Sequence, residues 1–313
     1  LQKTAGDRMR SLIERYTTNP VMGVLVGIAV TVLIQSSSGT TVLAVGLVNA
    51  GLMSLRQAIG IVMGANVGTT ITAFIIGIKI EDYALPIIAV GAILLFFFKK
   101  KTFNYIGQII FGFGMLFFGL STMGGGVKPL KDLAVFQDFI TDLAIPVLGV
   151  LVGTVFTVIV QSSSATIGIL QTIADEGMIT LRTALPVLFG DNIGTTITAV
   201  LASLGASVAA KRTAAVHVIF NVVGTVIFVL ALEPVYRLVL WAGTLTDVNI
   251  RMQIAYAHGF FNVTNVLIQL PFIAVLAYIA TRLIPGEMKT LEFTPKYLDS
   301  RLLNNPSVGL GQA

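Results

Sequence analysis

The chain has 313 residues, of which 55 % are hydrophobic and only 11 % are charged, and its mean hydropathy is +0.89. A soluble globular domain carries about a quarter charged residues, so this composition argues against a cytosolic enzyme, a disordered protein and a nucleic-acid-binding domain, and we expect no nucleic-acid partner. The net charge of +5 requires no anionic partner, because basic residues of membrane proteins gather on cytoplasmic loops. An integral membrane protein is predicted.

The first apolar region, residues 20–51, is interrupted in its middle. Short limbs at Pro20–Ile34 and Thr40–Gly51 flank the polar run Gln35-Ser36-Ser37-Ser38. A helical limb of this length reaches about 22 Å, less than the hydrocarbon core of about 30 Å. Each limb therefore enters the membrane and stops, and the pair predicts a re-entrant hairpin with its polar tip at membrane depth.

Longer apolar stretches follow the first hairpin. Three of them, Leu55–Ile78, Ala84–Phe98 and Phe103–Met123, precede a polar linker at Gly124–Asp142. Because a spanning helix needs about 20 mostly apolar residues, each stretch is predicted to cross the membrane, although Ala84–Phe98 is short.

A second interrupted region follows the linker. Limbs at Pro146–Val160 and Thr166–Gly177 flank Gln161-Ser162-Ser163-Ser164, which predicts a second re-entrant hairpin. The remaining predicted spans are Thr183–Leu204, Ala214–Leu232 and Ile254–Ile284. Pro271 is expected to kink the last of them.

The two hairpins are copies of one sequence. Adding 126 to any position from 20 to 73 gives its partner without a gap, and 26 of these 54 pairs are identical. The matched region extends beyond the hairpins into Asn66-Val67-Gly68-Thr69-Thr70 and Asn192-Ile193-Gly194-Thr195-Thr196. Internal duplication of this kind is common among membrane transport proteins.

The predicted spans set the orientation of the copies. Three spans separate the hairpins, and three is odd, so the copies are expected to enter from opposite faces. Fourteen of the 20 basic residues fall on the face that carries the N-terminus, the 99–101 loop and the C-terminal tail, and this face is predicted to be cytoplasmic.

The predicted fold is therefore an all-α integral membrane protein with about six spanning helices and two re-entrant hairpins in an inverted-topology repeat. We expect a membrane domain at 1–285, with repeat one at about 1–101, repeat two at about 102–232 and an additional helix at 254–284. Residues 286–313 are predicted to form a cytoplasmic tail of a multi-pass cell-membrane protein. The repeat offset also predicts one more spanning helix before Leu1 in the native protein.

The polar tips are chemically unusual for membrane depth. An unsatisfied hydroxyl or amide is costly there, and four consecutive polar residues occur at each tip. Hydroxyl and Gln carbonyl oxygens are neutral ligands for a hard cation. Free N–H groups at a helix N-terminus bind an oxyanion, whereas freed carbonyls bind Na⁺. The glycines at 64, 68, 190 and 194 are expected to allow close helix packing and unwinding of the second paired motif.

Other intramembrane polar residues leave two interpretations open. Asp191, whose repeat partner is Ala65, is the one acid within a predicted apolar span and is a candidate coupling residue. His217 and Asn221 lie one helical turn apart. A polar stripe, which fits either inter-helix hydrogen bonding or a transport role, comprises His258, Asn262, Asn265 and Gln269.

The doubled Gln-Ser-Ser-Ser, each followed by Gly-x-Asn-x-Gly-Thr-Thr, resembles the type II sodium-dependent phosphate cotransporters and their bacterial relatives, over roughly residues 1–285. The resemblance implies symport of inorganic phosphate with Na⁺ by alternating access, with no enzymatic activity. It leaves the oligomeric state open, a homodimer being one option. The expected ligands and surroundings are phosphate, sodium ions and a lipid bilayer.

The resemblance also assigns site residues. Phosphate ligands are expected at Ser36, Ser37, Ser38, Thr40, Ser162, Ser163, Ser164 and Thr166. Sodium ligands are expected at Gln35, Gln161, Asn66, Thr69, Thr70, Asn192, Thr195 and Thr196.

Two departures from the family and three alternatives stand beside this interpretation. Electrogenic animal members carry an Asp at a position that we align with Gly51, so the number of sodium ions is open. Bacterial relatives often continue into a PhoU-like domain, which Pro295–Ala313 would begin.

The alternatives are transport of another small anion (sulfate, arsenate or a carboxylate), a passive phosphate-sensing membrane protein, and an intramembrane serine protease. The duplication of the motif argues against the protease.

Overall fold

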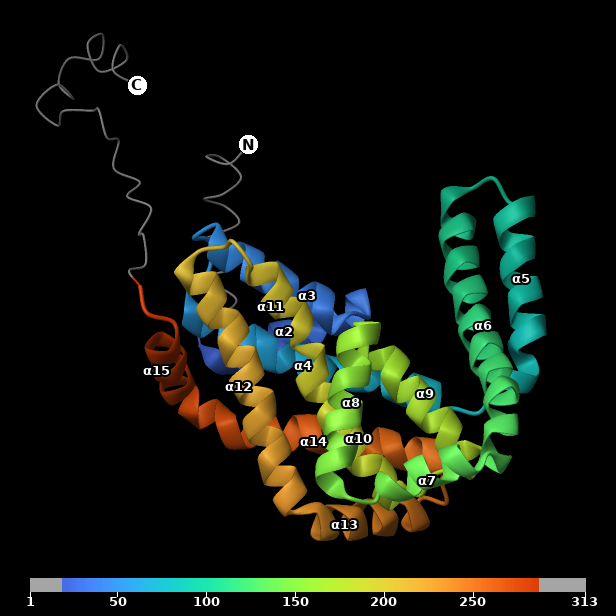
Figure 1. Ribbon diagram of the computed structural model, residues 1–313. Helices are drawn as coiled ribbons and strands as arrows, with labels where there is room; N and C mark the ends of the chain where they lie inside the picture. The colour runs from blue at the N-terminus through green and yellow to red at the C-terminus, as the bar shows by residue number, and fades with distance from the viewer. Residues whose placement is uncertain (1–18, 287–313) are drawn as a thin grey trace, which may run out of the picture.

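The computed structural model describes residues 19–286, and every regular element in that range is a helix (Figure 1). This confirms the all-α class. The predicted N-terminal linker segment at 1–18 and the predicted cytoplasmic tail at 287–313 lie outside the described residues.

The first interrupted region forms two helices, α2 (Pro20–Ile34) and α3 (Ser37–Asn49). Asn19 caps α2 by accepting a hydrogen bond from the Met22 N–H, and Pro20 occupies the first turn, where its missing N–H costs nothing. The helix ends at Gln35, whose φ of 56° is left-handed. This residue turns the chain directly into α3.

The second interrupted region repeats this arrangement. Its helices are α8 (Pro146–Val160) and α9 (Ser163–Asp175), and α8 ends at Gln161 with φ of 57°. The second limb of each hairpin begins three residues earlier than predicted, because Ser36 and Ser162 serve as N-caps.

The helix after each hairpin differs between the copies. In the first copy it is the continuous α4 (Leu55–Gly77); in the second it is α10 (Leu181–Thr195) followed by α11 (Ile197–Ser203), with a break at Thr196. The expectation that glycines unwind the paired motif is therefore wrong for α4, which stays helical through Gly64 and Gly68.

Glycines bring each first limb against the following helix. A Cβ on Gly64 would lie 2.0 Å from the Val24 carbonyl oxygen, and one on Gly190 would lie 2.0 Å from that of Val150. Gly27 and Gly153 make the reciprocal approaches to Ile61 and Val187. The backbones of α2 and α4, and of α8 and α10, are thus in direct contact, as small residues permit in membranes.

Helices α5 (Ala84–Phe97) and α6 (Lys101–Val127) form an antiparallel pair beside the hairpin bundle (Figure 1). The predicted span at 84–98 has only 14 helical residues, too few to cross a core of about 30 Å upright. The predicted polar linker folds as a 3₁₀ turn (Lys128–Asp132) and α7 (Ala134–Asp142), and α7 meets α8 at a bend of 110°.

The C-terminal part consists of α12 (Val208–Leu230), α13 (Leu232–Leu245), α14 (Ile250–Gln269) and α15 (Ile273–Leu283). A 3₁₀ turn at Leu270–Phe272 separates the last two and confirms the kink at Pro271. Helix α13 was not predicted from the sequence, because Glu233 and Arg237 interrupt its apolar pattern.

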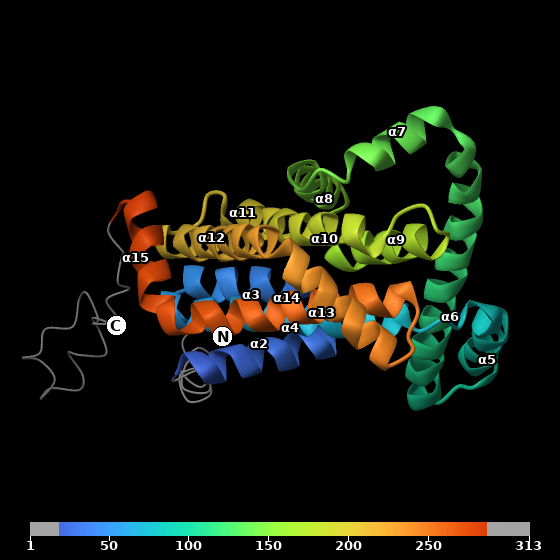
Figure 2. The ribbon, with the colours of Figure 1, turned by 90° about the horizontal axis from the view of Figure 1, so that it is seen from below.

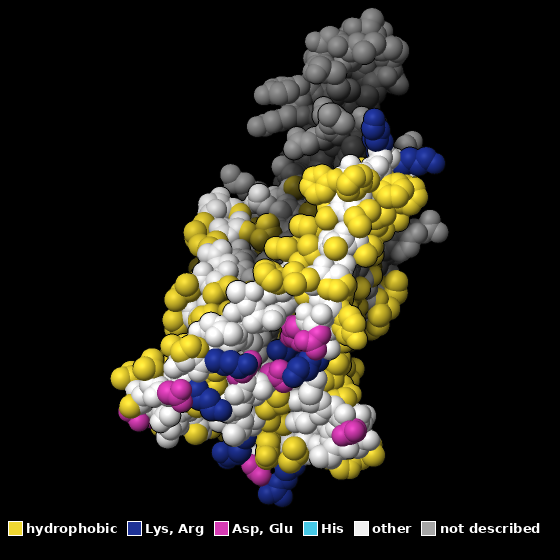
Figure 3. Space-filling model, turned by 90° about the vertical axis from the view of Figure 1, so that its right-hand side faces the viewer, with side chains coloured by type: hydrophobic (Ala, Val, Ile, Leu, Met, Phe, Trp, Pro, Cys, Tyr) yellow, Lys and Arg dark blue, Asp and Glu magenta, His cyan; other side chains and the backbone are white. Residues whose placement is uncertain are grey.

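Five of the described helices, some of them continuous through a short 3₁₀ turn, are long and apolar enough to cross a membrane, or six if the bent α7–α8 pair counts as one span. In Figure 2, α2, α4, α10, α12 and α14 lie in stacked layers that run in a similar direction, and α6 crosses at one end. Exposed apolar side chains cover much of the face in Figure 3. Exposed apolar side chains of the α5–α6 pair include Phe96, Phe97 and Ile109, as expected for contact with lipid.

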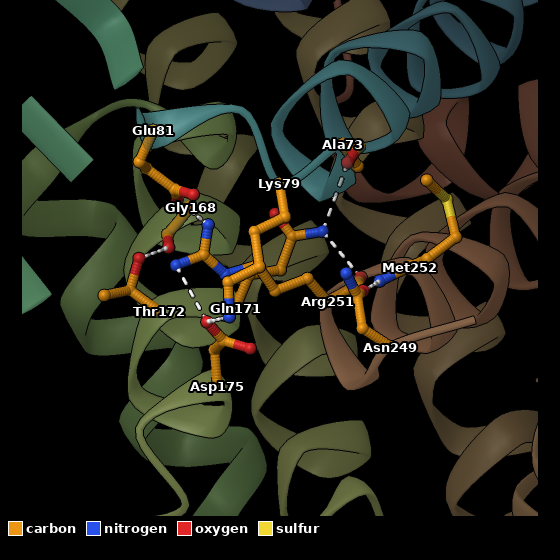
Figure 4. A network of polar contacts seen from close by, with 10 residues as sticks. All are labelled: Ala73, Lys79, Glu81, Gly168, Gln171, Thr172, Asp175, Asn249, Arg251 and Met252. Carbon is orange, nitrogen blue, oxygen red and sulfur yellow. Dashed lines mark hydrogen bonds and ion pairs between the residues drawn. The ribbon is translucent and has the colours of Figure 1, made fainter. Parts of the chain in front are cut away.

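A charged network joins the end of α9 to α14 (Figure 4). The buried Arg251 at the start of α14 forms ion pairs with Glu81, in a 3₁₀ turn at Glu81–Tyr83, and with Asp175, at 3.2 Å. Lys79 also pairs with Asp175, at 3.2 Å. One helical turn before Asp175 in α9, Gln171 Nε2 donates to the carbonyls of Ala73 and Arg251. The second hairpin is therefore bonded to two neighbouring elements.

Candidate functional site

The two polar tips have the same local geometry. Ser36 Oγ accepts the Gly39 N–H at 3.0 Å, and Ser162 Oγ accepts the Ala165 N–H at 3.3 Å. In both tips the Gln side chain is exposed, the second Ser is buried and the flanking Ser residues are half-buried. The sequence identity of the tips therefore extends to their structure.

Four hydroxyls at the start of the second limbs are free to donate. Among the described residues, no protein group hydrogen-bonds the side chains of Ser37, Ser38, Ser163 or Ser164. Ser37 and Ser163 are each 6 % exposed. These hydroxyls lie in the first turns of α3 and α9, where unpaired N–H groups and the helix dipole favour an anion.

The hydroxyls of the predicted ligands Thr40 and Thr166 are engaged within their own hairpins. Thr40 Oγ1 lies 3.1 Å from the Ser36 carbonyl and 2.9 Å from the hydroxyl of Thr31. Thr166 repeats both contacts, with the Ser162 carbonyl at 3.1 Å and with Thr157 at 3.0 Å. Both residues are buried, and they hold the tip against the first limb.

The hydroxyls of the threonines in the second motif donate hydrogen bonds to backbone carbonyls of their own helices. Thr69 bonds the carbonyl of Ala65 and Thr195 that of Asp191, while Thr70 and Thr196 bond carbonyls three residues back. A hydroxyl engaged in this way presents only oxygen lone pairs to a ligand. Such an oxygen suits a cation better than a phosphate.

The two Asn residues of the second motif are not equivalent. Asn66 donates to Asn221 Oδ1 at 2.7 Å and lies 3.2 Å from His217 Nε2 on α12. Asn192 donates to the Leu188 carbonyl of its own helix. The tip glutamines also differ: Gln35 Oε1 accepts from Thr72 at 2.9 Å, and Gln161 has no corresponding hydrogen bond among the described residues.

Asp191 contacts the first limb of the second hairpin and is 0 % exposed. Its Oδ1 is 2.9 Å from Thr157 Oγ1, and its Oδ2 has no hydrogen-bond partner among the described residues. This side chain is therefore connected to the tip through Thr157 and Thr166.

The polar stripe on α14 is explained largely by helix packing. Gln269 Nε2 donates to the Phe220 carbonyl at 2.9 Å and to Asn265 Oδ1 at 2.6 Å, and Asn262 donates to the His258 carbonyl. Asn265 and Gln269 both reach the Phe220 carbonyl on α12, which favours inter-helix hydrogen bonding for this end of the stripe. His258 and Asn262 make no side-chain hydrogen bond to another helix among the described residues.

Each hairpin also contacts the other half of the protein: α3 packs on α11, and α9 packs on α4. The structure therefore places the second limbs at the contact between the halves. The roles of Thr31, Thr157 and Thr72 were not predicted from the sequence. The signal for the first two was their identity across the repeat, and Thr72 offered a comparable one, since its partner is Thr198.

Several apolar helices long enough to cross a membrane, together with two helix hairpins that carry free polar groups at their tips, define the class of an α-helical membrane transport protein rather than an enzyme. The chain belongs to the Na⁺/Pi-cotransporter family, whose model matches residues 1–125 and 134–246.

Three relatives illustrate the relationship. The chain is 34 % identical to the uncharacterized protein YqeW of Bacillus subtilis, over 87 % of each chain. It is 29 % identical to the putative inorganic phosphate export protein YjbB of Escherichia coli, over the whole of this chain and 57 % of that protein. Over 24 % of this chain and 12 % of the relative, it is 45 % identical to the sodium-dependent phosphate transport protein 2A of Rattus norvegicus. The chain thus spans little more than half the length of YjbB. No solved structure matches it.

Proposed function

We propose that this protein transports inorganic phosphate across the cell membrane coupled to sodium ions, by alternating access. The observation that carries the proposal is the set of four unengaged hydroxyls on Ser37, Ser38, Ser163 and Ser164 at two helix N-termini. Hydroxyl and N–H donors are the groups that recognise an oxyanion without fixing it by a permanent charge. Membership of the Na⁺/Pi-cotransporter family supports the same substrate.

Sodium is proposed to bind at oxygens that cannot donate. Four threonine hydroxyls already donate their hydrogen bonds to backbone carbonyls, namely those of Thr69, Thr70, Thr195 and Thr196. With the oxygens of Gln35, Gln161, Asn66 and Asn192, they supply neutral ligands suited to a monovalent cation that must leave again. Ser36, Ser162, Thr40 and Thr166 are proposed to shape the phosphate site by fixing the tips.

Loss of one tip hydroxyl is expected to weaken transport. We expect Ser37→Ala or Ser163→Ala to reduce sodium-driven uptake of labelled phosphate into proteoliposomes by about tenfold, about 1.4 kcal/mol, because one hydrogen bond to a charged ligand is lost. Gln35→Ala and Gln161→Ala should have effects of similar size. Ser121→Ala on the exposed face of α6 is the matched control. Wild-type uptake by all four tip variants would refute the site.

Two further measurements separate the closest alternatives. Competition of sulfate, arsenate and small carboxylates against labelled phosphate identifies the anion. The relative named as a phosphate exporter makes direction a second question, so efflux from preloaded vesicles is measured with the sodium gradient reversed. A passive phosphate sensor would show no uptake that follows the gradient.

We further propose that the hairpins enter from opposite faces as an inverted repeat, within the domain limits 1–285, with repeats at about 1–101 and 102–232. The turn between α5 and α6 and the start of α12 lie on one side of the molecule, whereas α7 and α13 lie on the other (Figure 1). This distribution supports the charge asymmetry of the sequence, and we propose that the basic side faces the cytoplasm.

Single cysteines test the topology, because the chain has none of its own. A cysteine at Lys100 or Lys211 should react with an impermeant reagent only from the cytoplasm, and one at Lys131 or Asp247 only from outside. All four positions are exposed, unlike the buried Arg251. Labelling of positions 100 and 131 from the same side would contradict the inverted repeat.

A further inference from the structure

Helix α13 presents a different surface on each of three sides. One side is buried in the core that α13 shares with α10 and α14, and it carries Leu232, Val235 and Val239. A second side is charged, with Glu233 and Arg237 one helical turn apart. The third side is apolar and exposed, and its residues, called here the α13 row, are Pro234, Leu238, Trp241 and Leu245. Residues at these spacings of three and four share one face of a helix.

The charged side of α13 faces a polar medium. Glu233 pairs with Arg237 at 2.9 Å and with Arg182, at the start of α10, at 3.5 Å. The side chains are 47 %, 76 % and 53 % exposed, in that order. Exposed charges of this kind are strongly disfavoured in hydrocarbon, so this side lies in water or among lipid headgroups.

The α13 row continues an apolar row on the preceding helix. α12 is long and apolar enough to cross a membrane, and Val222, Val226 and Leu230 are exposed on it at intervals of four residues. Pro234 and Leu238 prolong the same interval past the end of α12. In Figure 1, α13 turns sideways from the lower end of α12 and runs along the bottom edge of the molecule. The surface that α12 offers to lipid therefore leads directly onto a helix that lies across the end of the bundle.

Trp241 distinguishes the surface of a bilayer from its core. Its side chain is 59 % exposed, and its indole N–H has no hydrogen-bond partner among the described residues. A free N–H group is costly in hydrocarbon. At headgroup level the same group can donate to lipid carbonyl or phosphate oxygens while the ring contacts the acyl chains, which is why Trp is enriched there.

We propose that α13 is an interfacial helix whose apolar row binds phospholipid. The row inserts between the headgroups and the upper acyl chains of one leaflet, and Glu233 and Arg237 stay in the polar layer above it. Helices with one apolar and one charged side occupy this position, with the apolar face about 5–10 Å into the boundary. Under the topology proposed above, this is the outer leaflet. Because α13 packs on α10 and α14, it holds both helices at a set depth.

Tryptophan fluorescence tests the proposal directly, because Trp241 is the only tryptophan of the chain. The wild-type protein is reconstituted in phosphatidylcholine whose acyl chains are brominated either near the headgroup or near the methyl end. We expect a larger loss of emission with the shallow bromines than with the deep ones. The emission maximum should also lie to the blue of that of free tryptophan in water.

A tryptophan at the middle of a spanning helix provides the control. Leu116 is exposed on α6, halfway along the span Lys101–Asp132. In the double variant Trp241→Phe with Leu116→Trp, the deep bromines should cause the larger loss of emission. This reversal would establish that the two lipids report depth.

Three outcomes would overturn the proposal. Deep bromines that quench Trp241 as strongly as shallow ones would place α13 in the hydrocarbon core. Quenching by aqueous acrylamide, with none by either lipid, would place the row in water. Protection from all three quenchers would show that protein, such as a second copy of this chain, covers the row. Because the fluorescence requires no transport, a failure here is distinct from a failure of phosphate uptake.

Discussion

Adding a single methyl group at Gly64 or Gly190 is expected to destabilise the protein severely. A Cβ at either position would lie 2.0 Å from a backbone carbonyl oxygen of the preceding hairpin limb, and backbone cannot rotate away as a side chain can. Overpacking typically costs about 1–3 kcal/mol, and we expect Gly64→Ala or Gly190→Ala to reach at least the upper end. Leu at either position should prevent folding. The measurement is thermal unfolding of the detergent-solubilised protein, followed by size-exclusion chromatography.

Gly112 on α6 provides the control for this substitution. It is also helical, but a Cβ there would meet nothing within 4 Å, so Gly112→Ala should be neutral or slightly stabilising, given the higher helix propensity of Ala. Equal losses at positions 64 and 112 would show that the glycines act through local propensity and not through contact between helices.

Arg251→Met is expected to destabilise the protein by about 3–5 kcal/mol, because it leaves buried or nearly buried carboxylates at Glu81 and Asp175 without their shared partner. The arginine side chain is 5 % exposed, and those of its partners 11 % and 15 %. Arg251→Lys should recover only part of the loss, because an ammonium group lacks the planar fork that reaches two acids. The free energy of unfolding in mixed detergent micelles is the measurement.

Arg237→Met is the matched control, since it breaks an exposed pair with Glu233 on α13. A hydrogen bond from Arg237 lowers the pKa of the Glu233 carboxyl, but exposed pairs contribute little to stability. Partial recovery of stability in the double variant Arg251→Met with Glu81→Gln is also expected. A small effect of Arg251→Met alone would show that the network does not hold the second hairpin in place.

The first limbs of both hairpins were predictable to the residue, because Pro20 and Pro146 start them and the polar tips end them. Helix α13 was not predictable, since charged residues at helical spacing interrupt its apolar positions. The length of α5 was overestimated from an apolar run that continues to Phe98 after the helix ends. Composition locates apolar segments, but helix ends depend on local hydrogen bonding.

Within the candidate site, residue types could be predicted, but their engagement could not. The sequence treats the hydroxyls of Ser37 and Thr40 alike, yet one is free and the other bonds Thr31. Likewise, the contact of Asp191 with Thr157 joins residues 34 positions apart, which no local pattern reveals. Hydrogen-bond partners are set by how helices pack, and this packing depends on glycines whose neighbours lie far away in sequence.

Because the two tips share one geometry, the first half of the chain can be compared residue by residue with the second half, as two duplicated sequences. The tips and their capping serines have not diverged, whereas the residues that attach the second limbs to neighbouring elements have. Asn49 accepts one hydrogen bond from the Ser207 N–H, at 2.7 Å, while its counterpart Asp175 joins an ionic network. Val45 likewise corresponds to Gln171, which binds two other helices. Divergence after duplication has thus kept the hairpin tips alike and specialised the attachments, leaving one hairpin held by charge and the other by a neutral contact.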